Sequence, residues 1–513
     1  MRKKFMIAEQ LQKIWKLIPL GVLFFFFFTI LKSLTLSLSN CIAFSIATIL
    51  LLLIPHLLKK TKLKEKINQW SPQTIKVLFR FLLLVHLIFM VLFSLLFISE
   101  PRNDLGTIYH SALEIVENGK INTEIDENTS CYHFYGYSNN DYFNNCQNNI
   151  MLLLILTLLY KVMSLLGFAL TLEGTLLISQ FFNILCIELA IWIGLKILQK
   201  KEDPFTSFIY FILSFFFLPY FINAFRFYTD TIVLPFSMLL IYLFISIDEQ
   251  KDNQKKRIFS WIGMGLLAFL AIQIKQSAGI IVVAMFLFLL FQKRKRDLLH
   301  FCTILLPILF LLMALFQFWI HHTSWIDMSR EEWIKFPTVH WISLGMTKSG
   351  SYSQDLVNLQ LEHETTVEQK EEIVLQILKQ QLSSYENMGE FLDFEFEKAV
   401  TTWCSGTYYQ NSHLTWFYPP NIFQEFLLSD GKYFETFSIV LKTYSFFLLV
   451  CFLQISIYQL KEKNCPNHVF YSLIILGLAL FLSFWETKSR YLLSFVPIFL
   501  LLVSDHLAKM DRE

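Results

Sequence analysis

Long apolar runs alternate with short charged segments along most of this chain. The runs are roughly 17–24 residues long, the length of helix that crosses a hydrocarbon core of about 30 Å. A large soluble protein would interrupt such runs with polar positions at helical spacing. The pattern therefore predicts an all-α polytopic membrane protein with about twelve transmembrane helices. We place these helices at 16–33, 37–58, 77–98, 175–198, 205–222, 231–247, 259–274, 277–291, 301–320, 436–458, 468–484 and 490–506.

The Lys and Arg residues of the short loops predict the orientation, because cytoplasmic loops carry an excess of these residues. The basic segments lie within 2–4, 59–66, 196–201, 251–257, 293–296 and 461–463. All of them fall on one side if the N-terminus is cytoplasmic. We therefore expect a multi-pass protein of the cell membrane with both termini in the cytoplasm. The first apolar run has no small-residue cleavage site after it, so we expect a retained helix and not a removed signal peptide.

Residues 150–168 are also apolar enough to span the membrane. A crossing there would reverse every later loop and place the basic segments outside. We therefore expect a re-entrant or interface-lying helix on the outer side. The alternative is a true span that ends in a tight hairpin at 171–174.

Two long polar segments then lie on the outer side, at 99–149 and 321–435. In the second, Thr365 and Glu368 have the spacing of a capping box, and the stretch that follows, to about Ser383, is amphipathic. This organisation predicts four parts: two extra N-terminal helices and a basic loop (1–76), a seven-span module (77–320), a large and partly helical outer loop (321–435), and three C-terminal helices (436–513).

Composition agrees with a membrane protein and limits the chemistry. Apolar residues make up 55% of the chain and charged residues 16%, and the formal net charge of +2 excludes a strongly basic nucleic-acid-binding protein. The chain has no CxxC or HExxH pattern, so no zinc site or other metal centre is predicted. Cys41, Cys186 and Cys451 lie in apolar runs, as buried small hydrophobes do. Cys131 and Cys146 share one polar loop and could form a disulfide or stay as two thiols.

Ionisable residues in or beside a span are costly to place there, so each is a candidate for function. Glu100 and Asp104 follow the third predicted span, where a carboxylate with apolar walls nearby could act as a general base. Alternatively both are ordinary solvated charges, with Asp104 capping a helix from Leu105 to Glu117.

Three further charged residues occur at predicted outer helix ends. Arg226 and Asp230 are four residues apart, so they could pair with each other, or Arg226 could bind a phosphate while Asp230 orients it. Lys275 is flanked by strongly apolar sequence. It could be a snorkelling side chain or a point charge for an anionic headgroup.

Two outer segments combine aromatic and charged residues. His340 and Trp341 lie in an aromatic-rich loop that could cover a cavity, with Trp341 as an interfacial anchor. Glu486, Arg490 and Tyr491 lie in the hairpin between the last two spans. They are anchoring residues or a phosphate clamp, in which Glu486 holds the orientation of Arg490. Because all these segments are predicted on one face of the membrane, they could share one outer cavity.

Four of these segments carry a resemblance to a known family. They are the acidic first outer loop with Asp104 and Tyr109, Arg226-Phe-Tyr-Thr-Asp230, the segment with Pro337, His340, Trp341 and Gly345, and Glu486 with Ser489-Arg490-Tyr491. Over roughly residues 77–506 the chain resembles the GT-C superfamily of membrane glycosyltransferases, which includes the protein O-mannosyltransferases of the glycosyltransferase 39 type. It looks most like the multi-spanning glycosyltransferase-like proteins of Gram-positive bacteria.

The resemblance implies a seven-span module whose first outer loop carries two helices lying along the membrane. It also implies an enzyme that moves a sugar from a polyprenyl-phosphate donor to a glycan, polymer or protein of the cell envelope, on the outer face and usually with inversion. The donor is a substrate, and no cofactor is implied. The base would be Asp104, with Glu100 second. Arg226, Lys275 and Arg490 would bind the donor phosphate, with Tyr109, Asp230, His340, Trp341, Glu486 and Tyr491 in support.

Two features depart from the family pattern. The adjacent acidic pair found in parts of the family is absent, because Glu100 and Asp104 are four residues apart. Two helices also precede the module. Two other functions remain open: a transporter or flippase for a lipid-linked glycan, and a non-catalytic membrane assembly factor. Transporters more often show internal repeats and Gly- or Pro-broken helices at matching places, and neither stands out in the sequence.

Overall fold

The computed structural model describes residues 2–98, 100–125, 136–200, 203–250, 253–361, 365–408, 421–461 and 466–510, and every regular element within these ranges is a helix. The long apolar helices are α1 (Arg2–Leu36), α2 (Leu38–Thr61), α4 (Pro72–Ser94), α8 (Leu172–Gln199), α9 (Pro204–Phe215), α12 (Leu234–Ser246), α13 (Gln254–Ile274), α14 (Gly279–Phe291), α16 (Leu306–His322), α23 (Phe434–Lys461), α24 (Pro466–Phe484) and α25 (Val496–Leu507). Short helices that extend or connect them are α3 (Leu63–Asn68), α10 (Leu218–Ile222), α11 (Thr229–Ile232), η3 (Ile247–Gln250), η4 (Gln276–Ala278), α15 (Lys295–His300), the π-helical turn η5 (Phe301–Leu305) and η7 (Ser489–Phe495).

The polar segments are also largely helical. The first contains α5 (Asn103–Asn118), α6 (Asn139–Asn145), η2 (Gln147–Asn149) and α7 (Ile150–Leu165). The second contains α17 (Glu331–Ile334), α18 (Thr338–Gly345), α19 (Gln354–Leu361), α20 (Val367–Ser383), α21 (Met388–Trp403) and α22 (Gln424–Leu427).

The predicted spans correspond to helices of the structure. In the described part of the chain, ten helices are long and apolar enough to cross a bilayer, and one of these is Gln147–Leu165, which contains α7. Three shorter apolar helices, Pro204–Phe215, Gln276–Phe291 and His468–Phe484, fill the remaining predicted positions. The all-α polytopic membrane architecture is therefore confirmed.

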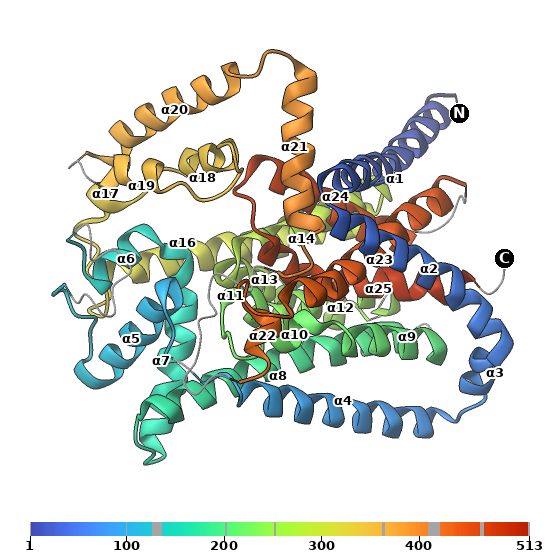
Figure 1. Cartoon of the computed structure of the whole chain (residues 1–513), viewed down its shortest axis with the longest axis horizontal. Helices are drawn as coiled ribbons and strands as arrows, with labels where there is room; N and C mark the ends of the chain where they lie inside the picture. Colours follow the sequence, from blue (N-terminus) through green and yellow to red (C-terminus); the bar gives the residue numbers. More distant parts are fainter. Residues whose placement is uncertain are drawn as a thin grey trace.

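The basic loops lie at one end of the molecule and the polar segments at the other. Figure 1 shows α3 and the start of α1 on the right, and α5, α6 and α17 to α20 on the left. At the first end, Lys64 donates to the Ala508 carbonyl at 2.6 Å, and Arg294 pairs with Asp248 at 2.7 Å. We call this end the basic end and the opposite one the outer end.

Helix α7 runs across the direction of the helices beside it. In Figure 1, α4 and α8 run along the long axis of the view, whereas α7 runs steeply across it at the outer end. Tyr160 of α7 shares a hydrogen bond of 2.8 Å with Ser179 of α8, so the two helices are in direct contact. Length and composition alone allow α7 to span a bilayer, but its direction agrees with the interface-lying interpretation.

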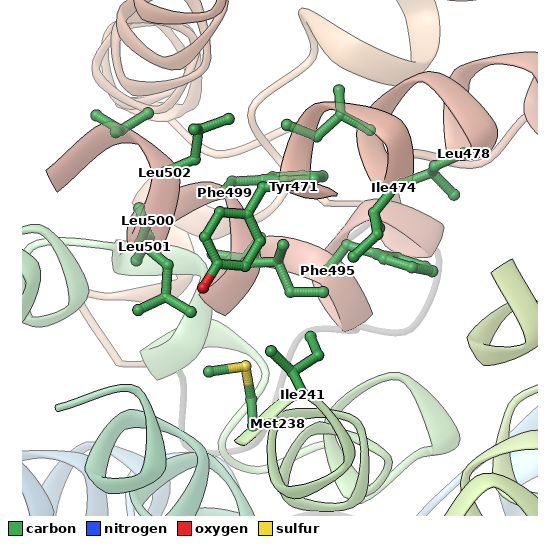
Figure 2. Close-up of a cluster of buried hydrophobic side chains, with 14 of the residues drawn as sticks. Met238, Ile241, Tyr471, Ile474, Leu478, Phe495, Phe499, Leu500, Leu501 and Leu502 are labelled. Atoms are coloured by element: carbon green, nitrogen blue, oxygen red, sulfur yellow. The ribbon is translucent and has the colours of Figure 1, made fainter. Parts of the chain in front are cut away.

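The last helix lies at the centre of the bundle. Its apolar window, within Ser489–Leu507, is 94% buried, compared with 17% for α2. Figure 2 shows Phe495 and Phe499 packed with Tyr471 and Ile474 of α24, and with Met238 of α12 below them. Protein rather than lipid surrounds α25. Close packing on all sides therefore holds the outer end of this helix in a fixed position.

The large outer segment is attached to the bundle by buried polar contacts. The ammonium of Lys398 in α21 donates to the carbonyls of Gly345 at 2.8 Å and Ser483 at 2.5 Å. A Cβ added at Gly345 would lie 2.7 Å from the Trp485 carbonyl oxygen, so only glycine allows this approach of α18 to the last hairpin. The predicted capping box was one residue out of register: Thr366 and Gln369, not Thr365 and Glu368, cap α20.

The orientation of the chain can be tested by labelling. On a background that lacks the eight native cysteines, we expect a cysteine at Glu371 to react with a membrane-impermeant maleimide added to intact cells. Cysteines at Lys256 and Arg294 should react only after the cells are opened, because we expect the basic end to face the cytoplasm. Labelling of Lys256→Cys in intact cells, with protection of Glu371→Cys, would invert the orientation. The structure does not decide between a Cys131–Cys146 disulfide and two thiols, because Cys131 lies outside the described residues.

Candidate functional site

The first outer loop places Asp104 at the start of a helix. Asp104 lies in the first turn of α5, where a carboxylate interacts favourably with the helix dipole. The N-cap is Arg102, so the alternative in which Asp104 caps the helix is wrong. The preceding residue, Asn103, has a φ of +54°, a left-handed conformation that Asn tolerates better than most residues. The half-buried Asp104 side chain accepts a hydrogen bond from the Tyr228 hydroxyl at 3.4 Å.

The segment that carries Arg226 and Tyr228 is not helical. It follows a break between α9 and α10 and precedes α11. The side-chain amide of Asn183, in the middle of α8, donates to the carbonyls of Asn223 at 2.8 Å, Ala224 at 3.0 Å and Arg226 at 3.3 Å. Irregular backbone is tolerated at this depth only where protein satisfies its polar groups. The Asn183 amide satisfies these carbonyls and so holds the backbone of Arg226 in position.

Asp230 pairs with Lys275 and not with Arg226. The Lys275 ammonium lies 2.5 Å from Asp230 Oδ1, and both side chains are largely buried. Lys275 is positioned where α13 ends and the backbone becomes extended. Ser494 of η7 donates to the Asp230 carbonyl at 3.1 Å and so links Asp230 to the last hairpin. Of the two alternatives for Arg226 and Asp230, a pair with each other is wrong for the described residues.

Arg490 and Arg226 converge on one aromatic ring. The guanidinium carbon of Arg226 lies 5.2 Å from the centre of the Tyr228 ring, and that of Arg490 lies 5.1 Å from it. Tyr491 contributes a second ring, 4.6 Å from the Lys275 ammonium and 5.6 Å from Arg490. These contacts are cation–π interactions. They bring residues from four separate parts of the sequence into one group: Asp104, Arg226, Tyr228, Asp230, Lys275, Arg490 and Tyr491, which we call the outer polar cluster.

Glu486 contacts the outer polar cluster through Tyr491. Its carboxylate accepts a hydrogen bond from the Tyr491 hydroxyl at 2.8 Å and pairs with Lys488 at 2.7 Å. The described partners of Glu486 are thus Tyr491 and Lys488, and its role in orienting Arg490 stays a prediction. Glu486 acts on the outer polar cluster through the Tyr491 ring.

Other predicted residues lie at the edge of the outer polar cluster. The Tyr109 hydroxyl shares a hydrogen bond of 2.6 Å with Thr175, which joins α5 to α8. Glu100 is largely exposed and lies 3.1 Å from His110. Glu100 is therefore less suited than Asp104 to act on a bound substrate.

The side chains of His340 and Trp341 lie in different parts of the structure. The Trp341 ring stacks on Trp485 at 6.2 Å, directly before Glu486, so Trp341 reaches the last hairpin. His340 instead is buried within the large outer segment, 2.6 Å from the Gln360 amide nitrogen and 4.4 Å from the Phe336 ring. Burial lowers the pKa of His340 to about 3, so the imidazole is neutral at physiological pH. These contacts are structural, and none of them places His340 in the outer polar cluster.

The outer polar cluster is largely buried and contains more cationic side chains than carboxylates. Burial, with the neighbouring Arg490, lowers the pKa of Arg226 to about 10, so Arg226 stays charged at neutral pH. Arg226 is 7% exposed, and its Nε has no hydrogen-bond partner within the described chain. Burial also lowers the pKa of Lys275 to about 8, an effect that Asp230 opposes. A buried cation with an unused donor is costly unless an anion neutralises it.

Sequence reasoning missed several polar residues inside apolar runs. Asn183 of α8 positions the outer polar cluster, and His86 of α4 lies 2.5 Å from Glu188 of α8 in a buried pair. The sequence does contain a signal for these residues, because a polar side chain in the middle of a span is a candidate for function or for packing. It was overlooked because each occurs singly.

Comparison with known proteins gives a family. No curated protein matches the chain. A family model described as "Conserved hypothetical integral membrane protein" matches residues 7–509, nearly the whole chain. This description agrees with the bundle of apolar helices in the structure. The chain therefore belongs to this family of integral membrane proteins.

Proposed function

We propose that this protein is a glycosyltransferase that moves a sugar from a polyprenyl-phosphate donor to a cell-envelope acceptor at its outer end. The observation that carries the proposal is the outer polar cluster. It combines three cationic groups, Arg226, Lys275 and Arg490, with the half-buried carboxylate of Asp104 at the outer ends of the helices. The resemblance to GT-C enzymes rests on the same residues.

The cations suit a phosphate leaving group. Asp230 pairs with Lys275, and the two guanidiniums that contact the Tyr228 ring add further positive charge to the cluster. Guanidinium groups bind phosphate oxygens through two parallel hydrogen bonds. Neutralising the phosphate lowers the cost of the charge that develops on it as the glycosidic bond breaks.

Asp104 suits the base. In the proposed reaction an acceptor hydroxyl attacks the anomeric carbon of the sugar, and Asp104 takes the hydroxyl proton. The bond between that carbon and the phosphate oxygen breaks, and polyprenyl phosphate leaves with the electron pair. The Tyr228 hydroxyl, which donates to Asp104, orients the carboxylate next to the same ring that the two arginines contact. Attack from the side opposite the phosphate inverts the anomeric centre.

The direct test is transfer of radiolabelled sugar. Membranes that contain the full-length protein are incubated with polyprenyl-phosphate sugars of several kinds and with a cell-envelope extract. We expect label in the extract with one of these donors, and none from membranes without the protein. Failure with every polyprenyl-phosphate sugar, under conditions where a known transferase works, would contradict the proposal.

One observation favours the transporter or flippase alternative. The span that starts with α9 is broken at Phe216–Phe217 and becomes non-helical before Arg226, as the discontinuous helices of many transporters do. The break was not predicted. In proteoliposomes with a fluorescent lipid-linked sugar and no acceptor, a flippase would move the lipid between leaflets, whereas a transferase would not.

Removal of Arg490 should weaken donor binding. We expect Arg490→Ala to reduce the affinity for a polyprenyl-phosphate sugar by about 1.5–3 kcal/mol, the value of a charge-assisted hydrogen bond. Arg490→Lys should restore only part of the loss, because an ammonium cannot make the bidentate contact. Equilibrium binding of the purified protein in detergent measures both. The control is Arg330→Ala, which removes a half-exposed guanidinium that pairs with Asp141. Equal affinities for Arg490→Ala and the control would remove Arg490 from the phosphate site.

A further inference from the structure

The basic end contains an open cavity of about 500 Å³ that the proposed transferase does not use. It lies between α12, α13, α14, α15 and α24. Four cationic side chains and two carboxylates line its polar part. Three phenylalanines, Phe244, Phe288 and Phe470, line its apolar part, with ring centres 5.1–5.9 Å apart. The cavity therefore has an aromatic floor and a positively charged mouth.

The positive charge of the cavity exceeds what its own carboxylates neutralise. Asp297 contacts both Arg257 and Arg294, and Arg294 also pairs with Asp248 at 2.7 Å. Lys295 and Arg296 are exposed and form no ion pair with any described residue. An anion at the mouth could therefore bind two cations that are not paired with any carboxylate of the described chain.

A buried donor at the cavity gives a second, independent sign of a ligand. Arg257 is 5% exposed, and its Nε has no hydrogen-bond partner among the described residues. A buried donor without a partner is costly. Because Arg257 also lines the cavity, an anion there would lie beside this incompletely satisfied guanidinium.

We propose that this cavity binds an anionic phospholipid of the leaflet at the basic end, with its phosphate at Lys295, Arg296 and Arg257 and the start of its acyl chains on the phenylalanine floor. Basic pockets between transmembrane helices are the sites that recognise anionic lipid headgroups. The apolar lining favours a lipid over a soluble anion, because acyl chains can contact the phenylalanine side chains and a free phosphate cannot. This site is separate from the outer polar cluster and does not depend on the transferase function.

Native mass spectrometry of the full-length protein in detergent tests the proposal, with phosphatidylglycerol and phosphatidylcholine as probes. We expect phosphatidylglycerol to bind and phosphatidylcholine to bind at least about 10-fold more weakly. The variant Lys295→Gln/Arg296→Gln should lower the affinity for phosphatidylglycerol by about 10- to 30-fold, from the loss of two charges near a phosphate. Both side chains are exposed, so this variant should fold. Ile245→Trp, which fills part of the cavity without changing its charge, should also reduce binding.

The matched control is Lys59→Gln/Lys60→Gln, which removes two exposed charges from the same end but outside the cavity. It should leave phosphatidylglycerol binding within about twofold of the unchanged protein. Three results would each overturn the proposal: an equal loss in the control, full binding by Ile245→Trp, or displacement of the lipid by inorganic phosphate, which would indicate a soluble anion site.

Discussion

Asp104→Asn is expected to lower the rate of sugar transfer by about 10²–10⁴-fold, the usual contribution of a general base. Asparagine keeps the shape of the side chain and can still accept from the Tyr228 hydroxyl, so the surrounding structure should be unchanged. Donor affinity should change little, because the carboxylate acts on the acceptor and not on the phosphate. Single-turnover transfer with saturating donor, together with equilibrium donor binding, separates the two effects.

Two control variants make the result specific. Asp355→Asn changes an exposed carboxylate of the large outer segment, and its rate should match that of the unchanged protein. Glu100→Gln should reduce transfer less than Asp104→Asn, because Glu100 is exposed and pairs with His110. Full turnover by a well-folded Asp104→Asn protein would rule out Asp104 as the base, and Glu100 would be the next residue to test.

The second large effect concerns stability. Asp230→Ala should destabilise the protein by about 3–5 kcal/mol, because it leaves the buried Lys275 ammonium without its partner in a place that already holds two guanidiniums. The double variant Asp230→Leu/Lys275→Met should recover most of this loss, since removing both charges leaves none unpaired. The unfolding free energy, measured in one detergent for all variants, gives the comparison.

An exposed ion pair provides the contrast. Lys32 and Asp393 lie 2.6 Å apart, nearly the same distance as Lys275 and Asp230, but the Asp393 side chain is 61% exposed. Asp393→Ala should therefore cost at most about 1 kcal/mol. If Asp230→Ala and Asp393→Ala cost the same, burial of the first pair would not contribute to stability, and Lys275 would have to have another partner or be uncharged.

The sequence predicted the elements that depend on long, uniform patterns. The spans follow from long runs of apolar residues, and the structure places helix at each one, although the predicted span 205–222 is divided into α9 and α10. The grouping of Asp104, Arg226, Lys275 and Arg490 at one end followed from loop charge alone, because topology brings alternate loops to the same side.

The pairing of individual side chains was less predictable. Asp230 is four residues from Arg226 in the sequence, yet it pairs with Lys275, because the non-helical segment before α11 turns Arg226 toward Tyr228. Asn183 makes that turn possible from a distant helix, and sequence spacing carries no sign of the contact. His340 was expected to support the site because of its residue type. In the structure it is buried against Gln360 and Phe336, which gives it a packing role.

The central position of α25 has a consequence for biosynthesis. A membrane protein is inserted from its N-terminus onward, so Arg490 and α25 enter the bilayer after every other described span. Until then Arg226, Lys275 and Asp230 lie in a bundle that lacks its middle helix, and the residues that later pack on Phe495 and Phe499 face lipid or one another. The outer polar cluster can therefore form only after the last hairpin and α25 have been inserted, because Arg490 and the Ser494 contact to Asp230 arrive together with them.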